Sequence, residues 1–134
     1  QNIYQTVKSM TAAEATLKDD GVIIVCSESG DGTGGDAFHN AFLEERDIEK
    51  LYKGFLDTPK IETIPDQWES QILCRILLKA KAVIYVSDYD SKILEDFHFI
   101  PVKTLDEAME KADELMGKDS TVTVIPDVIA VIVK

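Results

Sequence analysis

The sequence predicts an α/β domain, layered, with helices packed on a mostly parallel or mixed sheet. Two apolar runs of strand length, 22–26 and 82–86, are separated by segments with helical periodicity. Unbroken apolar runs are typical of strands buried on both faces, and strands that alternate with helices indicate a layered fold. The length of 134 residues suits one domain, so we expect 1–134 to form a single domain.

The first part of the chain is predicted to form one helix, one strand and one loop. A helix is expected over 2–19, ending at the Asp-Asp-Gly of 19–21, and the strand 22–26 follows. The loop over 27–35 then contains four of the seven glycines. The apolar stripe of the helix consists of Ile3, Val7, Met10, Ala13 and Leu17.

Two further helical stripes follow the loop, over 37–42 and 48–56. The next helix is predicted to begin at Thr63-Ile64-Pro65-Asp66, because a hydroxyl cap, an early proline and an acid are typical of a first turn. It should run to about Lys79. Its inward residues are Ile72, Leu73, Ile76 and Leu77.

The last third of the chain should contain one helix among short strands. Thr104 to Glu107 is a capping box, and Gly117 closes the helix, whose core residues are expected to include Leu105 and Ala108. The final two strands would join at Pro126-Asp127, as a hairpin or a bulged turn. The strands expected here are 82–86, 99–102, 121–125 and 128–133.

Charge and composition exclude several functions. The chain has 14 Lys+Arg and 25 Asp+Glu, a formal charge of −11, which disfavours a nucleic-acid partner. No apolar run approaches the roughly 20 residues of a membrane span. Cys26 and Cys74 are too few for a disulfide scaffold, so we expect a cytoplasmic protein. The chain begins at Gln1 without a secretory segment, which favours a piece of a longer protein.

The glycine-rich loop has two interpretations. Gly30, Gly32 and Gly35 match the G-x-G-x-x-G pattern of dinucleotide-binding loops, between a strand and a helix. Against it, three residues separate the strand from the first glycine, and no ribose-binding acid follows a second strand. The other interpretation is a mobile connection that needs positive φ angles and does not bind a dinucleotide. The acids that would repel a pyrophosphate are Glu28, Asp31 and Asp36.

The sequence offers few residues that could form a metal site or a nucleophile. His39 and His98 are the only histidines and neither has a metal-ligand spacing. We expect His39 at the surface or half-buried, and His98 packed beside a strand. Cys26 and Cys74 are expected to be buried and unreactive. The chain therefore predicts no metal site and no complete active site of its own.

Three polar or aromatic residues lie away from the predicted core. Gln5 and Lys8 share the face of the first helix opposite its apolar stripe, beside Tyr4. Trp68, the only tryptophan, lies about 100° from the centre of its helix's apolar stripe. The face around Lys8 is either solvated or covered by another domain. Trp68 is either an edge-of-core residue or an indole presented to a ligand or partner domain.

Four segments together resemble a known family. Residues 4–10 (YQTVKSM), 21–25 (GVIIV), 31–38 (DGTGGDAF) and 65–69 (PDQWE) resemble the C-terminal domain of nickel-dependent lactate racemases. The closing region 122–133 also fits. The likeness keeps order and spacing over nearly the whole chain, and four segments in register are more specific than any one of them.

The resemblance implies an isomerase, a racemase or epimerase of 2-hydroxy acids. Members transfer the Cα hydride to a nickel-pincer nucleotide tethered to a lysine, while a histidine takes the hydroxyl proton. These groups belong to an N-terminal catalytic domain that is absent from this chain. The resemblance therefore implies a cofactor-free C-terminal domain, inactive in isolation, whose partners are that N-terminal domain and a small 2-hydroxy acid.

The family closes its cleft with a Gln, a Lys and a Trp, which by motif are Gln5, Lys8 and Trp68, with Tyr4 beside them. The resemblance implies that these residues contact substrate or cofactor. Lys8 could bind a carboxylate, Gln5 could donate or accept a hydrogen bond, and Trp68 could exclude water. Two alternatives stay open: a non-catalytic ligand-binding or regulatory module of the same fold, and a nucleotide-binding domain that uses the glycine loop.

Overall fold

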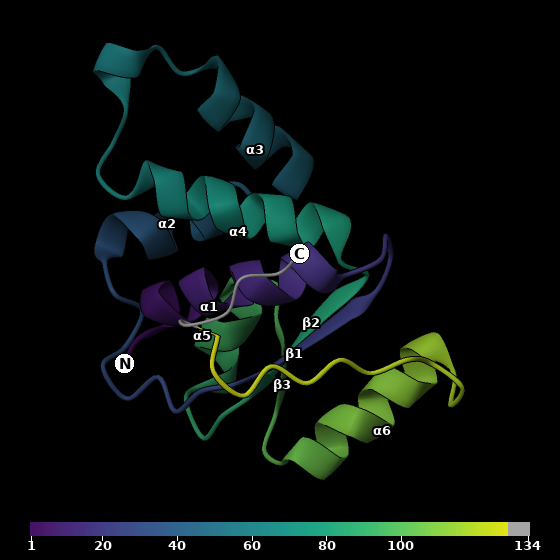
Figure 1. The fold of residues 1–134 in the computed structure, drawn as a ribbon. Helices are drawn as coiled ribbons and strands as arrows, with labels where there is room; N and C mark the ends of the chain where they lie inside the picture. The colour runs from purple at the N-terminus through teal and green to yellow at the C-terminus, as the bar shows by residue number, and fades with distance from the viewer. Residues whose placement is uncertain (129–134) are drawn as a thin grey trace.

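The sheet is parallel, as predicted. The structure, a computed structural model, describes residues 1–128, and within them three strands form one sheet in the order β1-β2-β3 (Figure 1). The strands are β1 (Val22–Cys26), β2 (Ala82–Val86) and β3 (Ile100–Val102). Both neighbouring pairs are parallel, with Ile24 opposite Ile84 and Ile84 opposite Ile100. The predicted α/β fold class is therefore confirmed.

Helices cover both faces of this sheet (Figure 1). The first and fourth helices pack against each other on one face, the third packs on the outside of the fourth, and the sixth contacts all three strands from the other face. No helix in the described part of the chain is long and apolar enough to cross a bilayer. The helices are α1 (Ile3–Thr16), α2 (Asp36–Glu44), α3 (Ile48–Asp57), α4 (Gln67–Lys79), α5 (Ser91–Asp96) and α6 (Leu105–Met116).

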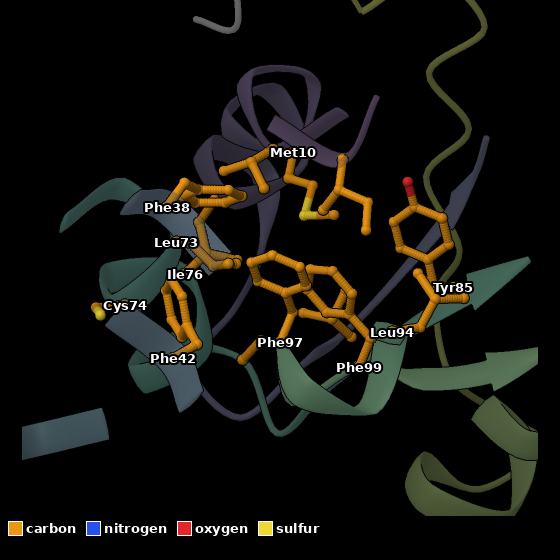
Figure 2. Packing of buried hydrophobic residues seen from close by; sticks show 14 of the residues in the cluster. Met10, Phe38, Phe42, Leu73, Cys74, Ile76, Tyr85, Leu94, Phe97 and Phe99 are labelled. Carbon is orange, nitrogen blue, oxygen red and sulfur yellow. The ribbon is translucent and has the colours of Figure 1, made fainter. Parts of the chain in front are cut away.

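The main core is built around aromatic rings between the sheet and helices α1, α2, α4 and α5. Phe97 lies at its centre, with ring centroids 4.9 Å from Phe38, 5.4 Å from Phe42 and 5.9 Å from Phe99 (Figure 2). All four rings are at most 3% exposed. We name these four phenylalanines the aromatic core.

β1 corrects one expectation from the sequence. Within the described residues it is an edge strand, and only Ile23 of its five residues is buried, whereas the central strand β2 is buried at Val83, Ile84 and Tyr85. Cys26 is the last residue of β1 and is exposed, contrary to the expected buried thiol. An apolar run alone does not distinguish an edge strand from a central strand, because both need one buried face.

Two helix boundaries differ from those expected. α1 ends at Thr16 rather than near residue 19, because Leu17 is extended and Asp20 adopts a left-handed φ of 60°. Acidic residues are unfavourable at a helix C-terminus, which explains the early end. α4 begins at Gln67, not at Thr63.

Gln67 determines where α4 begins. A short 3₁₀ turn, η1 (Lys60–Glu62), comes first, and Asp66 precedes the helix with a left-handed φ of 62°. The buried Gln67 side chain donates to the carbonyl of Phe55 at 3.3 Å and accepts from the N–H of Ile64 at 3.3 Å. These two bonds, one local and one to α3, fix the turn before α4, and the helix starts later than the Thr-Ile-Pro-Asp pattern indicates.

Helices α5 and α6 confirm some predictions for the last third of the chain and show others to be wrong. The Thr104 hydroxyl accepts a hydrogen bond from the backbone N–H of Glu107, and the Glu107 carboxylate accepts one from the backbone N–H of Lys103. Gly117 ends α6 with a φ of 86°. Leu105, however, is 54% exposed. α5 was not expected from the sequence, and its N-cap, Asp90, accepts from Lys92.

The strand expected over 121–125 is absent. Residues 121–125 form no regular structure, and Val122 and Val124 are 60% and 80% exposed. β-propensity depends on the packing and burial that the surrounding structure provides, so alternating β-branched residues do not by themselves form a strand. The strand expected over 128–133 lies outside the described residues, apart from Val128.

Candidate functional site

Three of the four site residues expected from the sequence lie in contact. The Nζ atom of Lys8 is 4.7 Å from the ring centroid of Tyr4 and 5.3 Å from that of Trp68. The two rings are 5.8 Å apart and meet edge to face at 89°. A cation over two aromatic faces is a favourable arrangement. We name Tyr4, Lys8 and Trp68 the lysine–aromatic cluster.

Helices α1 and α4 bring the cluster together. Tyr4 and Lys8 are four residues apart, so they project from the same side of α1. Asn2 caps this helix by accepting from the N–H of Gln5 at 2.9 Å. Trp68 is in the first turn of α4, which packs along α1. It stays 50% exposed, so the cluster opens to the surface.

Gln5 is placed apart from Trp68. It is exposed on α1 and lines, with Lys8, an open hollow of about 990 Å³ beside the carboxyl end of β1. Ala12 and Ala15 also line this hollow, and Trp68 does not. Lys8 therefore belongs both to the hollow and to the cluster, and it links Gln5 to Trp68.

Glu69 is a site residue that the sequence reasoning missed. It follows Trp68 but is fully buried, and neither carboxyl oxygen has a hydrogen-bond partner within residues 1–128. Burial raises the pKa of Glu69 to about 7; the charge of Lys8 acts to lower that pKa and the charge of Asp66 to raise it. The helical periodicity of α4 could have indicated this burial, because position 69 lies one turn before Leu73 on the same inward face.

Tyr4 joins the cluster to the protein interior. Its ring meets Phe38 of the aromatic core edge to face at 5.5 Å. Burial first, and then the Asp66 carboxylate, raise the pKa of Tyr4 to about 12. The hydroxyl therefore remains protonated at neutral pH and can donate a hydrogen bond.

The glycine-rich loop supports the start of α1. The N–H groups of Ile3 and Tyr4 donate to the carbonyls of Gly32 and Thr33 at 3.0 and 3.1 Å. These bonds satisfy amides that the first turn of a helix leaves free. Gly34 has a φ of 98°, and a Cβ atom there would lie 2.5 Å from the Cβ of Tyr4. The loop expected to be a mobile connection is thus hydrogen-bonded to the helix that carries the cluster.

The histidines lie elsewhere. Nε2 of His39 is 3.0 Å from the carboxylate of Asp96, and its ring stacks on Phe97 at 5.1 Å. His98 has a buried Nε2 without a hydrogen-bond partner in the described part of the chain. Among residues 1–128, no group of three or more His, Cys, Asp or Glu side chains could hold a metal ion.

Comparison with known proteins gives one consistent result. A family model described as the lactate racemase C-terminal domain matches residues 1–133. The chain is 48% identical to a lactate racemase of Lactiplantibacillus plantarum and 43% identical to one of Thermoanaerobacterium thermosaccharolyticum. Each alignment covers the whole chain, which spans about 32% of the length of either relative.

A solved structure agrees with these relatives. The chain superposes on the lactate racemase apoprotein of Thermoanaerobacterium thermosaccharolyticum with a TM-score of 0.96 at 45% sequence identity. The match covers all of this chain and 32% of the solved one.

Proposed function

The chain belongs to the family of lactate racemase C-terminal domains, and from this premise we propose that it covers the substrate in a racemase of 2-hydroxy acids. The observation that carries the proposal is the lysine–aromatic cluster, which presents a cation and an indole on one open face. The rest of such a protein, including the N-terminal catalytic domain, would lie outside this chain.

Lys8 is proposed to receive the substrate carboxylate. Its ammonium is exposed and has no carboxylate at ion-pair distance within residues 1–128. Tyr4 and Trp68 hold the side chain through their ring faces without neutralising its charge. A carboxylate that approached Lys8 would form a charge-assisted hydrogen bond, directly or through water.

The other residues are proposed to orient the substrate and exclude water. Gln5 faces the same hollow as Lys8 and can donate or accept a hydrogen bond. Trp68 offers a half-exposed apolar wall, which would shield a hydride transfer from water once a second domain closes over it. Tyr4 keeps its proton and can donate to an oxygen of the substrate or cofactor.

The nickel-pincer nucleotide that the resemblance implies finds no metal-ligand set within residues 1–128, where no group of three or more His, Cys, Asp or Glu side chains could hold a metal ion. When bound elsewhere in the protein, that cofactor would supply the hydride acceptor. We therefore assign to this chain only substrate binding, orientation and the exclusion of water.

The test is Lys8→Ala in the full-length protein loaded with its cofactor. Interconversion of D- and L-lactate gives KM and kcat by chiral analysis. Loss of a charge-assisted contact costs about 1.5–3 kcal/mol, so KM should rise about 10- to 150-fold. The matched control is Lys53→Ala, because Lys53 is an exposed lysine of α3 outside the site.

Two results would contradict the proposal. If Lys8→Ala leaves KM within about twofold of the parent protein, Lys8 does not bind the carboxylate. If the parent protein bound lactate but did not interconvert its enantiomers, a non-catalytic ligand-binding module would be the better description.

A further inference from the structure

A buried carboxyl group lies beneath the lysine–aromatic cluster. Glu69 is adjacent to Trp68 at the start of α4, yet its side chain is fully buried while the indole is half exposed. Its two carboxyl oxygens have no hydrogen-bond partner among the described residues. A buried carboxylate without partners is costly, so this position needs an explanation beyond packing.

The charges around Glu69 come from two directions. Lys8 and Tyr4 face it from α1, and Asp66 lies just before α4. Among the described residues, the Lys8 ammonium favours the ionised form of Glu69 and the Asp66 carboxylate opposes it. Burial raises the pKa of Glu69 most and the Lys8 ammonium counteracts that rise, so a change in the charge around Lys8 would shift the carboxyl group toward its protonated form.

We propose that Glu69 is the counter-charge of Lys8 when the site is empty, and that it takes up a proton when an anionic ligand reaches Lys8. This proposal rests on the proposed function, in which Lys8 binds the substrate carboxylate. Glu69 acts through Lys8 and is a positioning residue, not a catalytic one.

Charge balance gives the physical reason. In the empty site, the Lys8 ammonium and the carboxylates of Glu69 and Asp66 sum to one negative charge. A bound 2-hydroxy acid adds a third carboxylate, which makes the sum two negative charges. Uptake of one proton from solvent by Glu69, with formation of one O–H bond and no other bond change, restores the net charge of the empty site. Binding of the ligand and protonation of Glu69 are then linked.

The linkage can be measured without turnover. The full-length protein is labelled with ¹³C at the glutamate carboxyl carbons, and the titration of Glu69 is followed by NMR, with Glu69→Gln identifying its signal. Lys8→Met, which keeps the length of the side chain, should raise the titration midpoint of Glu69 by about one unit, because the favourable cation is gone. If Glu69→Gln fails to fold, Glu69→Asp identifies the signal.

The ligand arm uses sodium lactate against sodium chloride at equal ionic strength. Lactate should raise the Glu69 midpoint in the parent protein and not in Lys8→Met. The inference is overturned if the titration midpoint of Glu69 is unchanged in Lys8→Met, or if saturating lactate leaves that midpoint unchanged in the parent protein. If the KM of Lys8→Ala rises but lactate does not shift the titration midpoint of Glu69, the proposed function stands and this inference alone fails.

Discussion

Two groups of aromatic residues meet at one contact and have opposite surroundings. The aromatic core of Phe38, Phe42, Phe97 and Phe99 is at most 3% exposed and packs within the main cluster of buried apolar residues. The ring centroid of Tyr4 lies 5.5 Å from that of Phe38, and Tyr4 also belongs to the lysine–aromatic cluster, in which Trp68 is half exposed near the Lys8 ammonium. The core rings are placed to stabilise the fold. An indole left half in water contributes less to stability and remains available to a ligand.

The sharpest test of this comparison is Phe97→Ala. Phe97 is fully buried and contacts three other phenylalanine rings, so its loss should lower the free energy of unfolding by about 3–5 kcal/mol. Denaturant titration of the full-length protein, followed by circular dichroism, measures this. A loss below about 1 kcal/mol would mean that the aromatic core does not hold the domain together.

The second test breaks the connection between the glycine loop and the cluster. Gly34→Ala places a side chain at a φ of 98° and a Cβ atom 2.5 Å from that of Tyr4, so strain and overpacking should together cost about 2–4 kcal/mol. Displacement of Tyr4 should also change the fluorescence of Trp68. The control is Gly54→Ala in α3, where nothing lies within 4 Å; it should stabilise by about 0.5–1 kcal/mol. Equal effects of the two variants would contradict the packing role of the loop.

The third test separates the two regions by pH, since the aromatic core has no titratable group. The folded pKa of Glu69 is raised from 4.5 to about 7. Between these values the folded chain keeps a proton that the unfolded chain has lost, so this residue's contribution to stability falls as pH rises from 4.5 to 7. Above pH 7 the contribution is constant.

The measurement is the difference between the parent protein and Glu69→Gln across that pH range. The difference in unfolding free energy should change by about 2 kcal/mol between pH 4.5 and 7, because one pKa unit corresponds to about 1.4 kcal/mol and neighbouring charges relax. A difference independent of pH would show that Glu69 titrates normally.

The smallest expected effect on stability is that of Trp68→Ala. The indole is half exposed, so the loss should stay below about 1 kcal/mol. Turnover of the full-length protein should nevertheless fall, because the apolar wall is gone. A fall in melting temperature of more than about 10 °C, as for a core residue, would place Trp68 with the aromatic core instead.

Local signals in the sequence predicted most of the helices and strands. The capping box from Thr104 to Glu107 and the closing Gly117 were read correctly, because both act within one or two turns of the chain. The central strand β2 was also found from its apolar run. Four motifs in register were enough to identify the family, which the comparisons then confirmed.

Tertiary structure decided what no local pattern contains. Within the described residues, β1 is an edge strand, residues 121–125 pair with neither edge of the sheet, and Gln67 bonds to Phe55 at the start of α4. In each case the deciding partner is remote in the sequence or absent, so composition and spacing could not reveal it.

The site follows the same division. The spacing of Tyr4 and Lys8 on one helix face follows from the sequence, because helical geometry alone sets it. Their contact with Trp68, 60 residues further along, depends on how α1 and α4 pack. The burial of Glu69, one residue from an exposed indole, depends on which side of α4 faces the interior. The sequence by itself determined which side chains share a helix face, whereas only packing between distant helices decided which of them meet and which carboxyl group is buried.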